Sequence, residues 1–444
     1  MIALLLWSSG SATLGREKVV IALDCWLPVM FCGDDTGAVV GEVAGYQSLF
    51  GNGGESVPKY MIPSHIACGG GGSGGRKAKR AGDLALGYHG LLGAELKNPM
   101  KDGDIYDWDC VEELWRTFYA NRERGESRES PALVVLPSWA PLKDVEKYAE
   151  IMYETFAVPH AYFQRKSVAS AFAAGRPTAL VLDSGYQSSS AVPVFEGHVL
   201  FKGIRRSRLS GDLLTREMLK HIESTGAKVR PSFMFTRHKN EQSGLESTLD
   251  ADYSNIHSTY VDYCQSEIAK DAKEYFCTMP RTPFDEKLAA RVPPDMFELP
   301  DGTSVNLTLG RYTVPELLMN TTPLKEVLPP GTVGDHLLSL PELISTSLLS
   351  SSVDIRRNLA NNCVLAGGNT CYKGIQTRLN LECNLLLPKA INMRFVSPSK
   401  LEARVSAWTG GSVLASLGSF QQLWVSKQEY EEHGGKILAE RCWT

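Results

Sequence analysis

The sequence predicts an α/β protein built from two similar lobes. Two apolar, β-branched segments end in an aspartate, KVVIALD at 18–24 and PTALVLDSG at 177–185, and one lies in each half of the chain. A third apolar segment, NNCVLAGGNT at 361–370, leads into a glycine turn. Buried strands whose ends lead into such turns are typical of α/β proteins with a ligand cleft at the strand ends. The repeated pattern indicates a duplicated fold.

Length and composition are those of an ordinary globular protein. The chain has 444 residues, of which 43% are hydrophobic and 22% are charged, and its formal net charge is -4. This length fits two or three domains or one large bilobal unit. The charge gives no overall preference for nucleic acid or an anionic membrane. The 10 cysteines include no CxxC pair, which favours reduced thiols in the cytosol or nucleus and argues against a zinc site.

Neither a secretory signal nor a membrane span is expected. The first residues, MIALLLW, are apolar, but no Lys or Arg precedes Arg16 and the run is short against the roughly 7–15 residues of a signal core. No apolar run approaches the ~20 residues of a membrane helix.

Helices are predicted where apolar residues recur at three- and four-residue spacing. These segments are 108–121, 142–156, 167–174, 265–279, 373–386 and 411–424. The stretch VSAWTGGSVLASL at 405–417 is interpreted as a glycine turn that opens the last helix. The polar stretch 237–262 is expected to be a surface excursion.

The segment GGGGSGGRKAKR at 69–80 is interpreted as a flexible, basic loop. Its simplest role is a solvated connection. The alternative is that Arg76, Lys77, Lys79 and Arg80 form a nuclear-import signal or a contact to DNA phosphates.

Two acids are the first candidates for chemistry. Asp24 and Asp183 each end a predicted strand, one per lobe, and could hold the waters of a Mg²⁺ bound to phosphates. The plain alternative is that both only cap turns. Ser184 and Gly185 fit a phosphate turn, because one offers a hydroxyl and the other allows close backbone approach. The glycines of AGGNT at 366–370 would place backbone against a base or ribose.

The stretch after Asp24 is a poor phosphate cradle. A cradle needs several converging N–H groups, yet Cys25, Trp26, Leu27 and Pro28 follow Asp24 and no glycine appears before residue 33. Pro28 has no N–H. We therefore expect this loop to be an apolar hairpin turn that contributes little to phosphate binding.

Taken together, these motifs resemble the actin family. The resemblance covers nearly the whole chain from Lys18, and its longest and most specific part is the C-terminal motif. The segments that carry it are LVLDSG…AVPVFEGHVL (180–200), AGGNTCYKGIQTRL (366–379), WTGGSVLASLGSFQQLWVSKQEYEEHG (408–434), NPMKDGDIYDWDCVEELW (98–115), IMYETFAVP (151–159) and ELPDG (298–302). Within the family, FDEKLAARVPPDMFELPDG (284–302) and the ending GGKILAERCWT are similar to the nuclear actin-related protein four subfamily.

The resemblance implies a bilobal fold of duplicated RNase H-like domains in four subdomains. Subdomain 1 would comprise residues 1–45, 98–174 and 405–444, and subdomain 2, with the basic insert, residues 46–97. Subdomain 3 would comprise 175–211 and 333–404, and subdomain 4 residues 212–332.

The same resemblance bears on ATP. Lys166 stands where actin has the glutamine that orients the attacking water, Tyr186 and Gln187 stand where it has a second acid, and Ser190 replaces a histidine. A lysine can only donate hydrogen bonds, so it is a poor base for water, although it could form a salt bridge with Asp183. We expect little or no hydrolysis. ATP with Mg²⁺ would be a structural ligand or absent, with the adenosine side formed by Gly367, Gly368, Asn369, Tyr372 and Arg404.

The resemblance also implies partners. In nuclear members of the family, a groove receives a helicase/SANT-associated helix from a remodeller motor or acetyltransferase scaffold, beside actin. Its lining here would be Phe172, Gly175, Leu414, Leu417 and Leu423, although several of these residues could simply fill the local core. We therefore expect a nuclear location, contact with nucleosome or DNA through the complex, and no self-polymerisation. The alternatives are an ATP-binding, filament-forming cytoskeletal protein and a sugar-kinase or chaperone ATPase.

Overall fold

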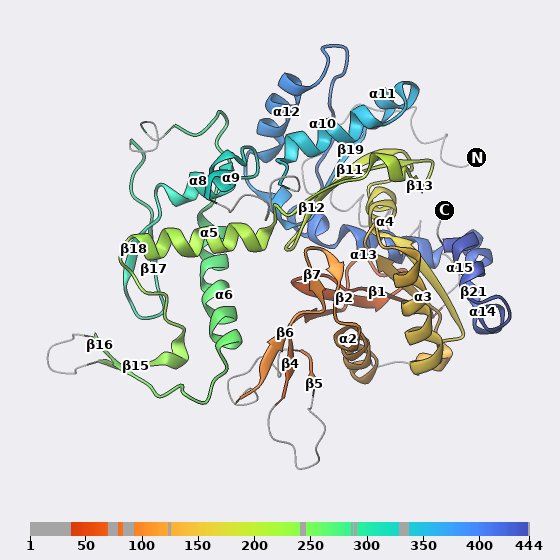
Figure 1. Ribbon diagram of the computed structural model, residues 1–444, viewed down its shortest axis with the longest axis horizontal. Helices are drawn as coiled ribbons and strands as arrows, with labels where there is room; N and C mark the ends of the chain where they lie inside the picture. Colours follow the sequence, from red (N-terminus) through yellow and green to blue (C-terminus); the bar gives the residue numbers. More distant parts are fainter. Residues whose placement is uncertain are drawn as a thin grey trace, which may run out of the picture.

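The computed structural model describes residues 37–69, 79–82, 93–122, 126–239, 246–285, 287, 291–327 and 337–442. The predicted strand 18–24, Asp24 and residues 70–78 of the basic insert lie outside these described residues. The described chain forms two lobes, each with its own central sheet (Figure 1).

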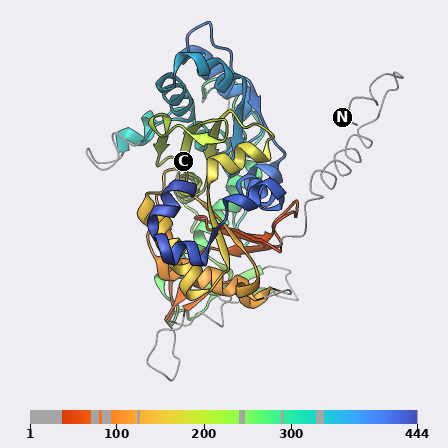
Figure 2. The ribbon, with the colours of Figure 1, turned by 90° about the vertical axis from the view of Figure 1, so that its right-hand side faces the viewer.

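The first lobe is built on a six-stranded sheet. Its strands in spatial order are β21 (Val425–Ser426), β10 (His160–Arg165), β9 (Ala132–Leu136), β1 (Val39–Glu42), β2 (Gln47–Asn52) and β3 (Tyr60–Pro63). β1, β9 and β10 run parallel, whereas β2 turns back antiparallel to β1. The helices of this lobe are α2 (Trp108–Asn121), α3 (Leu142–Glu150), α4 (Lys166–Ala173), α13 (Lys400–Ser416), α14 (Lys427–His433) and α15 (Gly435–Cys442). Figure 2 shows α14 and α15 at the outer side of the lobe, where α15 packs on α3.

The second lobe contains a similar sheet. Its strands are β13 (His198–Val199), β12 (Ser189–Phe195), β11 (Ala179–Ser184), β19 (Cys363–Ala366) and β20 (Phe395–Val396), and β14 (Arg205–Ser207) also pairs with β12. The helices are α5 (Gly211–Ser224), α6 (Ser258–Phe276), α8 (Gly310–Glu316), α9 (Thr322–Val327), α10 (Leu340–Ser350), α11 (Val353–Asn361) and α12 (Ile375–Leu386).

The two sheets share one topology. In the first, the hairpin β1–β2 is followed by β9 and β10 added parallel to β1. In the second, the hairpin β11–β12 is followed by β19 and β20 added parallel to β11. The expected duplication is therefore present, and Glu42 at the end of β1 is the counterpart of Asp183 near the end of β11.

Short strands complete the described chain as one three-stranded sheet and three pairs. They are β4 (Ile66–Cys68) with β5 (Lys79–Arg80) and β6 (Glu95–Lys97), β7 (Met100–Lys101) with β8 (Asp104–Ile105), β15 (Phe235–Lys239) with β16 (Glu246–Asp250), and β17 (Met296–Glu298) with β18 (Ser304–Asn306). Short 3₁₀ helices lie at Ser127–Glu129, Phe201–Gly203, Ser232–Met234, Gly368–Cys371 and Gly418–Leu423, and a short π-helix lies at Ile151–Thr155.

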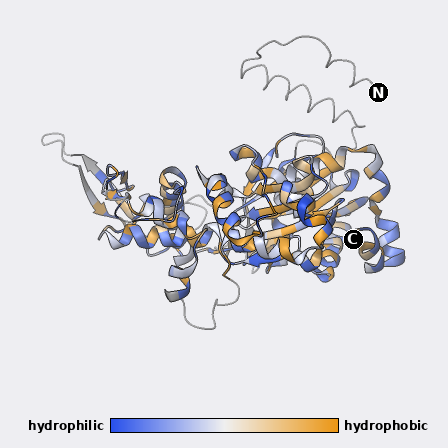
Figure 3. Ribbon diagram, turned by 90° about the horizontal axis from the view of Figure 1, so that it is seen from above, coloured by the Kyte–Doolittle hydropathy of each residue, from blue (hydrophilic) through white to orange (hydrophobic). Residues whose placement is uncertain are grey.

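Apolar side chains fill the core of each lobe, and in Figure 3 much of the ribbon of the central strands has the colour of hydrophobic residues. In the first lobe, the fully buried Trp115 and Trp408 pack with Phe50 around the sheet. The indole of Trp408 donates a hydrogen bond to the carbonyl of Val40 at 3.0 Å, which ties α13 to β1. A second core of leucine and methionine side chains fills the other lobe.

The glycine pair at 410–411 is not a turn, contrary to the prediction. Both residues lie inside α13, which begins at Lys400 and ends at Ser416. A Cβ on Gly410 would lie 1.8 Å from the carbonyl oxygen of Ala169 in α4. The glycine therefore lets two helices cross at backbone contact, and the expected helix over 411–424 is replaced by the end of α13 and a 3₁₀ segment.

The other elements agree with the predictions or differ at their ends. α2 matches 108–121, and the strands predicted at 177–185 and 361–370 are β11 and β19. The helix predicted at 265–279 begins earlier, at Ser258, because His257 caps it by accepting a hydrogen bond from the amide of Thr259. The described part of 237–262 lies mostly at the surface, as predicted, and it contributes to the β15–β16 hairpin and the start of α6.

Candidate functional site

Two turns face each other where the lobes meet. Residues 43–46 connect β1 to β2, and residues 185–188 connect β11 to β12. The turns touch directly, because a Cβ on Gly45 would lie 2.6 Å from the side chain of Gln187. By topology these are the two loops at the strand ends where an α/β cleft binds its ligand. The first loop was sought after Asp24, whereas the structure forms it after Glu42.

Lys166 lies between the two strand-end acids. It is the first residue of α4, directly after β10. Its Nζ is 2.9 Å from Asp183 Oδ2 and 3.2 Å from Glu42 Oε1. The expected salt bridge to Asp183 is therefore formed, and the bond to Glu42 was not anticipated.

The charges of this cluster affect one another. Burial acts to lower the pKa of Lys166, but the charges of Asp183 and Glu42 outweigh it and raise that pKa above the ordinary lysine value. Burial raises the pKa of Glu42, and the attraction of Lys166 offsets this only in part. Lys166 is thus held as an ammonium that donates to carboxylates from both lobes. Asp183 Oδ1 is buried and has no hydrogen-bond partner among the described residues.

The second turn is held by its own hydrogen bonds. The hydroxyl of Ser184 lies 2.7 Å from that of Ser189 and accepts from the Asn369 amide at 3.1 Å. The same amide donates to the carbonyl of Gly185 at 3.0 Å, and the Gly185 N–H bonds to Ser188 O at 2.9 Å. The structure thus joins the predicted phosphate residues Ser184 and Gly185 to Asn369, which was predicted on the adenosine side, and their polar groups are already engaged.

Gly367 needs to be glycine at this position. Its φ is +84°, and a Cβ there would lie 2.3 Å from the carbonyl oxygen of Ser184 and 2.5 Å from Asp183 Oδ1. Left-handed backbone and close approach are both conditions that only glycine meets without strain. The glycine loop therefore packs onto the end of β11.

The predicted adenosine residues lie near a buried lysine that the sequence analysis missed. Arg404 forms an ion pair with Glu274 of α6 at 2.6 Å, and the site for a Cβ on Gly368 is 3.9 Å from the Arg404 Nε atom. Lys273 is 4% exposed and donates to the carbonyl of Gly211 at 2.8 Å. Burial lowers the pKa of Lys273 to about 8. The signal available in the sequence was the position of Lys273 in a predicted helix, four residues after Ala269 and next to Ala272, which places a lysine on the apolar face.

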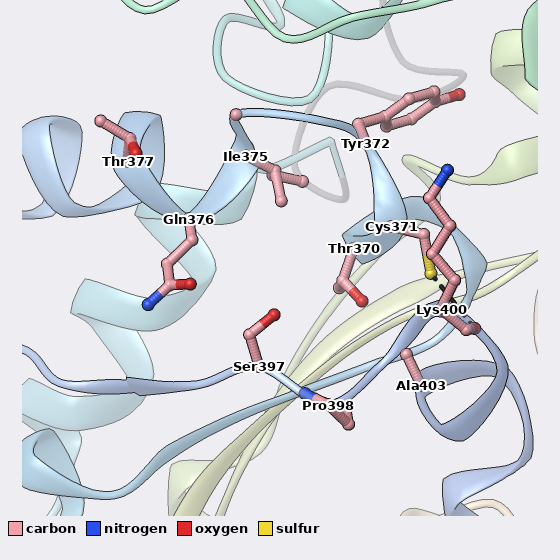
Figure 4. Close-up of a pocket in the computed structure, with 11 residues that line it drawn as sticks. Thr370, Cys371, Tyr372, Ile375, Gln376, Thr377, Ser397, Pro398, Lys400 and Ala403 are labelled. Carbon is pink, nitrogen blue, oxygen red and sulfur yellow. Dashed lines mark hydrogen bonds between the residues drawn. The ribbon is translucent and has the colours of Figure 1, made fainter. Parts of the chain in front are cut away.

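A pocket of about 280 Å³ lies beside the glycine loop, between the start of α12 and the start of α13 (Figure 4). Thr370, Gln376, Ser397 and Lys400 line it with polar groups. Tyr372 also borders it, and Figure 4 shows its ring at the edge of the pocket. Of the predicted adenosine residues, Tyr372 is the one that lines this pocket.

The predicted groove residues differ in exposure. Leu414 is 5% exposed and belongs to the first core, whereas Leu423 is 41% exposed. Phe172 and Leu417 are half-buried against that core. Gly175 is exposed at the end of α4 with φ +64°. The predicted groove residues that remain accessible are therefore Leu423, Gly175 and the outer parts of Phe172 and Leu417.

The described residues offer neither a metal-binding cluster nor a membrane-spanning helix. In that part of the chain, no three His, Cys, Asp or Glu side chains gather as they would around a metal ion. None of the described helices is long and apolar enough to cross a membrane.

Comparisons with known proteins agree with this architecture. The Actin family model matches residues 33–443, a span that begins close to β1 rather than at the strand predicted over 18–24. The chain is 34% identical over 452 residues to "Actin-related protein 4" of Oryza sativa, covering 93% of this chain and all of that protein. It is 33% identical over 442 residues to the protein of that name in Arabidopsis thaliana, with the same coverage, and 34% identical over 353 residues to that of Yarrowia lipolytica, covering 79% of this chain and 81% of the relative. The chain therefore belongs to the actin family, as an actin-related protein with the actin-like α/β fold.

Proposed function

We propose that this chain is a structural, non-hydrolysing subunit of a nuclear complex that remodels chromatin or acetylates histones. The proposal is supported by similarity to proteins named Actin-related protein 4 over 93% of the chain. It is also supported by the motifs in which the sequence resembles the nuclear subfamily. In this role the chain lies beside actin, receives a helix from a motor or scaffold subunit, and meets the nucleosome or DNA through the complex.

The state of Lys166 carries the claim that ATP is not hydrolysed. Hydrolysis needs a group that orients the attacking water and accepts its proton. At this position Lys166 is an ammonium that donates to Glu42 and Asp183 at 3.2 and 2.9 Å. It has no lone pair for a proton, and it neutralises the acids that would otherwise hold Mg²⁺ and its waters. Any ATP–Mg²⁺ that the chain carries is proposed to be a structural ligand.

Docking is proposed to use the exposed edge of the predicted groove. Leu423 is 41% exposed at the end of the 3₁₀ segment after α13. Leu417 at the end of α13 and Phe172 on α4 are partly exposed and pack against the same core, so they offer further apolar surface. Apolar surface of this kind suits the apolar face of an amphipathic helix.

Affinity purification of the tagged full chain from nuclear extract tests docking. Wild type should co-purify actin and a motor or scaffold subunit. Leu423→Asp should lose the scaffold, because a carboxylate would be buried unpaired in the contact. Leu385→Asp is the matched control, since Leu385 is 80% exposed on α12 of the other lobe. Equal recovery with both variants, or wild type that pellets as filaments with ATP, would contradict the proposal.

A further inference from the structure

We infer that the chain's own side chains hold the two lobes closed at the place where the actin family binds a Mg-nucleotide, so that closure requires no ligand. This inference deepens the proposed function, since it rests on the same Lys166 cluster, but it concerns stability rather than partners. The residues that form this interlobe clasp are Glu42, Tyr46, Lys166, Asp183, Tyr186 and Gln187.

The centre of the clasp is the ion cluster. Glu42 belongs to the sheet of the first lobe and Asp183 to that of the second. Facing each other without a cation, the two carboxylates would repel and push the lobes apart. Lys166 binds both, so its ammonium provides the attraction that a bound metal would otherwise supply. It is covalently part of the chain and is present in every molecule.

The two turns make the second set of contacts. The Gln187 amide reaches from the second lobe to donate to the carbonyl of Met100 at 2.8 Å. Asn98 donates to the carbonyl of Gly45 at 2.6 Å and so holds the first turn against this contact. Space between the turns is lacking, because even a Cβ on Gly45 would overlap Gln187.

Tyrosine rings form the third set. Tyr46 of the first turn packs against Tyr186 of the second, with ring centroids 5.2 Å apart. The hydroxyl of Tyr46 donates to Glu267 of α6 at 2.8 Å and also contacts Lys270. The Lys270 ammonium lies 4.2 Å from the centre of the Tyr46 ring. Tyr46 therefore crosses from one lobe to the other between the two turns.

A triphosphate does not fit this arrangement. Residues 42–52 and 185–188 contain no Lys or Arg, so neither turn brings positive charge. Among the described residues, Lys166 is the cation that bonds to the strand-end acids, and it is already shared by two carboxylates. A phosphate chain would have to separate the turns, displace the tyrosines and approach two acids. We therefore assign the closed lobe arrangement to the clasp rather than to bound nucleotide.

Thermal unfolding of the full chain provides the test. The unfolding midpoint of wild type should be the same in EDTA, in Mg²⁺ alone and in excess Mg-ATP, because a ligand that does not bind gives no stabilisation. A midpoint that rises by several degrees with Mg-ATP would overturn the inference. That result would leave docking untouched, which co-purification measures separately.

Two variants and a control locate the effect. Lys166→Met should lower the midpoint by several degrees and speed hydrogen exchange at 43–46 and 185–188. Tyr46→Phe removes only a hydroxyl and should speed exchange at the same turns without loss of folding. Arg116→Met is the matched control, because Arg116 also meets two carboxylates, Glu112 and Glu113, but on the exposed face of a single helix, α2. Its midpoint should barely change. If Lys166→Met and Tyr46→Phe leave exchange at the turns as in wild type, the clasp does not exist.

Discussion

Adding one methyl group at Gly410 should destabilise the first lobe. The glycine lies in α13 where that helix crosses α4, and a Cβ there would be 1.8 Å from the carbonyl oxygen of Ala169 and 2.4 Å from its carbonyl carbon. Real Cβ atoms essentially never come closer than 3.0 Å to such atoms. Both contacts are backbone, so no side-chain rotation relieves them.

Two opposing effects decide the size of the change. In an unpacked helix, Gly→Ala would gain about 1 kcal/mol from helix propensity. Here the helices must separate by about 1.2 Å, the difference between 3.0 and 1.8 Å. Overpacking of this kind costs about 1–3 kcal/mol, and more where backbone must move. Because α13 also carries the buried Trp408, we expect Gly410→Ala to lower the free energy of unfolding by about 2 kcal/mol.

Two other glycines give a graded comparison. Gly411 meets side chains of Val40, Leu133 and Val135 at 3.0–3.2 Å, which can yield slightly, so Gly411→Ala should be close to neutral. Gly418 has nothing within 4 Å, and Gly418→Ala should change stability by less than about 0.5 kcal/mol. Denaturant unfolding followed by tryptophan fluorescence measures all three. If Gly410→Ala is as stable as wild type, the helix crossing is not at backbone contact.

Three further outcomes are expected. Burial lowers the pKa of Lys273 to about 8 from the ordinary 10.5, so between these pH values the unfolded chain binds a proton that the folded chain does not. The free energy of unfolding of wild type should therefore rise with pH relative to that of Lys273→Met, by at most about 3 kcal/mol. Denaturant titrations at pH 7.5 and 10 measure this rise. Arg378→Met should lower the free energy of unfolding by about 3–5 kcal/mol, because Glu316 and Glu382, each 2.7 Å from the buried guanidinium, would lose their partner. A drop in the urea midpoint no larger than that of Arg116→Met would contradict this. Lys166→Gln should not create ATP turnover, because the turns still contact each other, and phosphate release at an actin-like rate would refute that reasoning.

Local pattern predicted the elements whose signals are local. The strands near 177–185 and 361–370 and the helix over 108–121 follow directly from apolar spacing, and the structure has all three. The salt bridge between Lys166 and Asp183 was one possibility that the resemblance to actin implied, and the structure forms it. These features depend on residues within one segment or on one charge pair.

The first loop could not be found that way. The segments 18–24 and 38–42 are both apolar and both end in an acid, so periodicity does not separate them. What distinguishes Glu42 is pairing of β1 with β9, about 90 residues farther along the chain, in the register Glu42 to Val135. Likewise, a glycine pair in a sequence predicts a turn. Gly410 and Gly411 lie inside the helix α13 instead, and the close approach of α4 to Gly410 explains why a glycine stands there.

The duplication of the fold places the ends of two equivalent strands, and therefore the two strand-end acids Glu42 and Asp183, close together. Because the hairpins β1–β2 and β11–β12 are topological equivalents, an acid at the end of each strand faces the other across the lobe boundary. Such a pair needs a cation, and a bound metal supplies one only in proportion to its concentration and affinity. Lys166 supplies it permanently, 2.9 and 3.2 Å from the two acids. A chain that closes its lobes in this way keeps a rigid surface for a partner at any nucleotide concentration, which is the property that the proposed docking role requires.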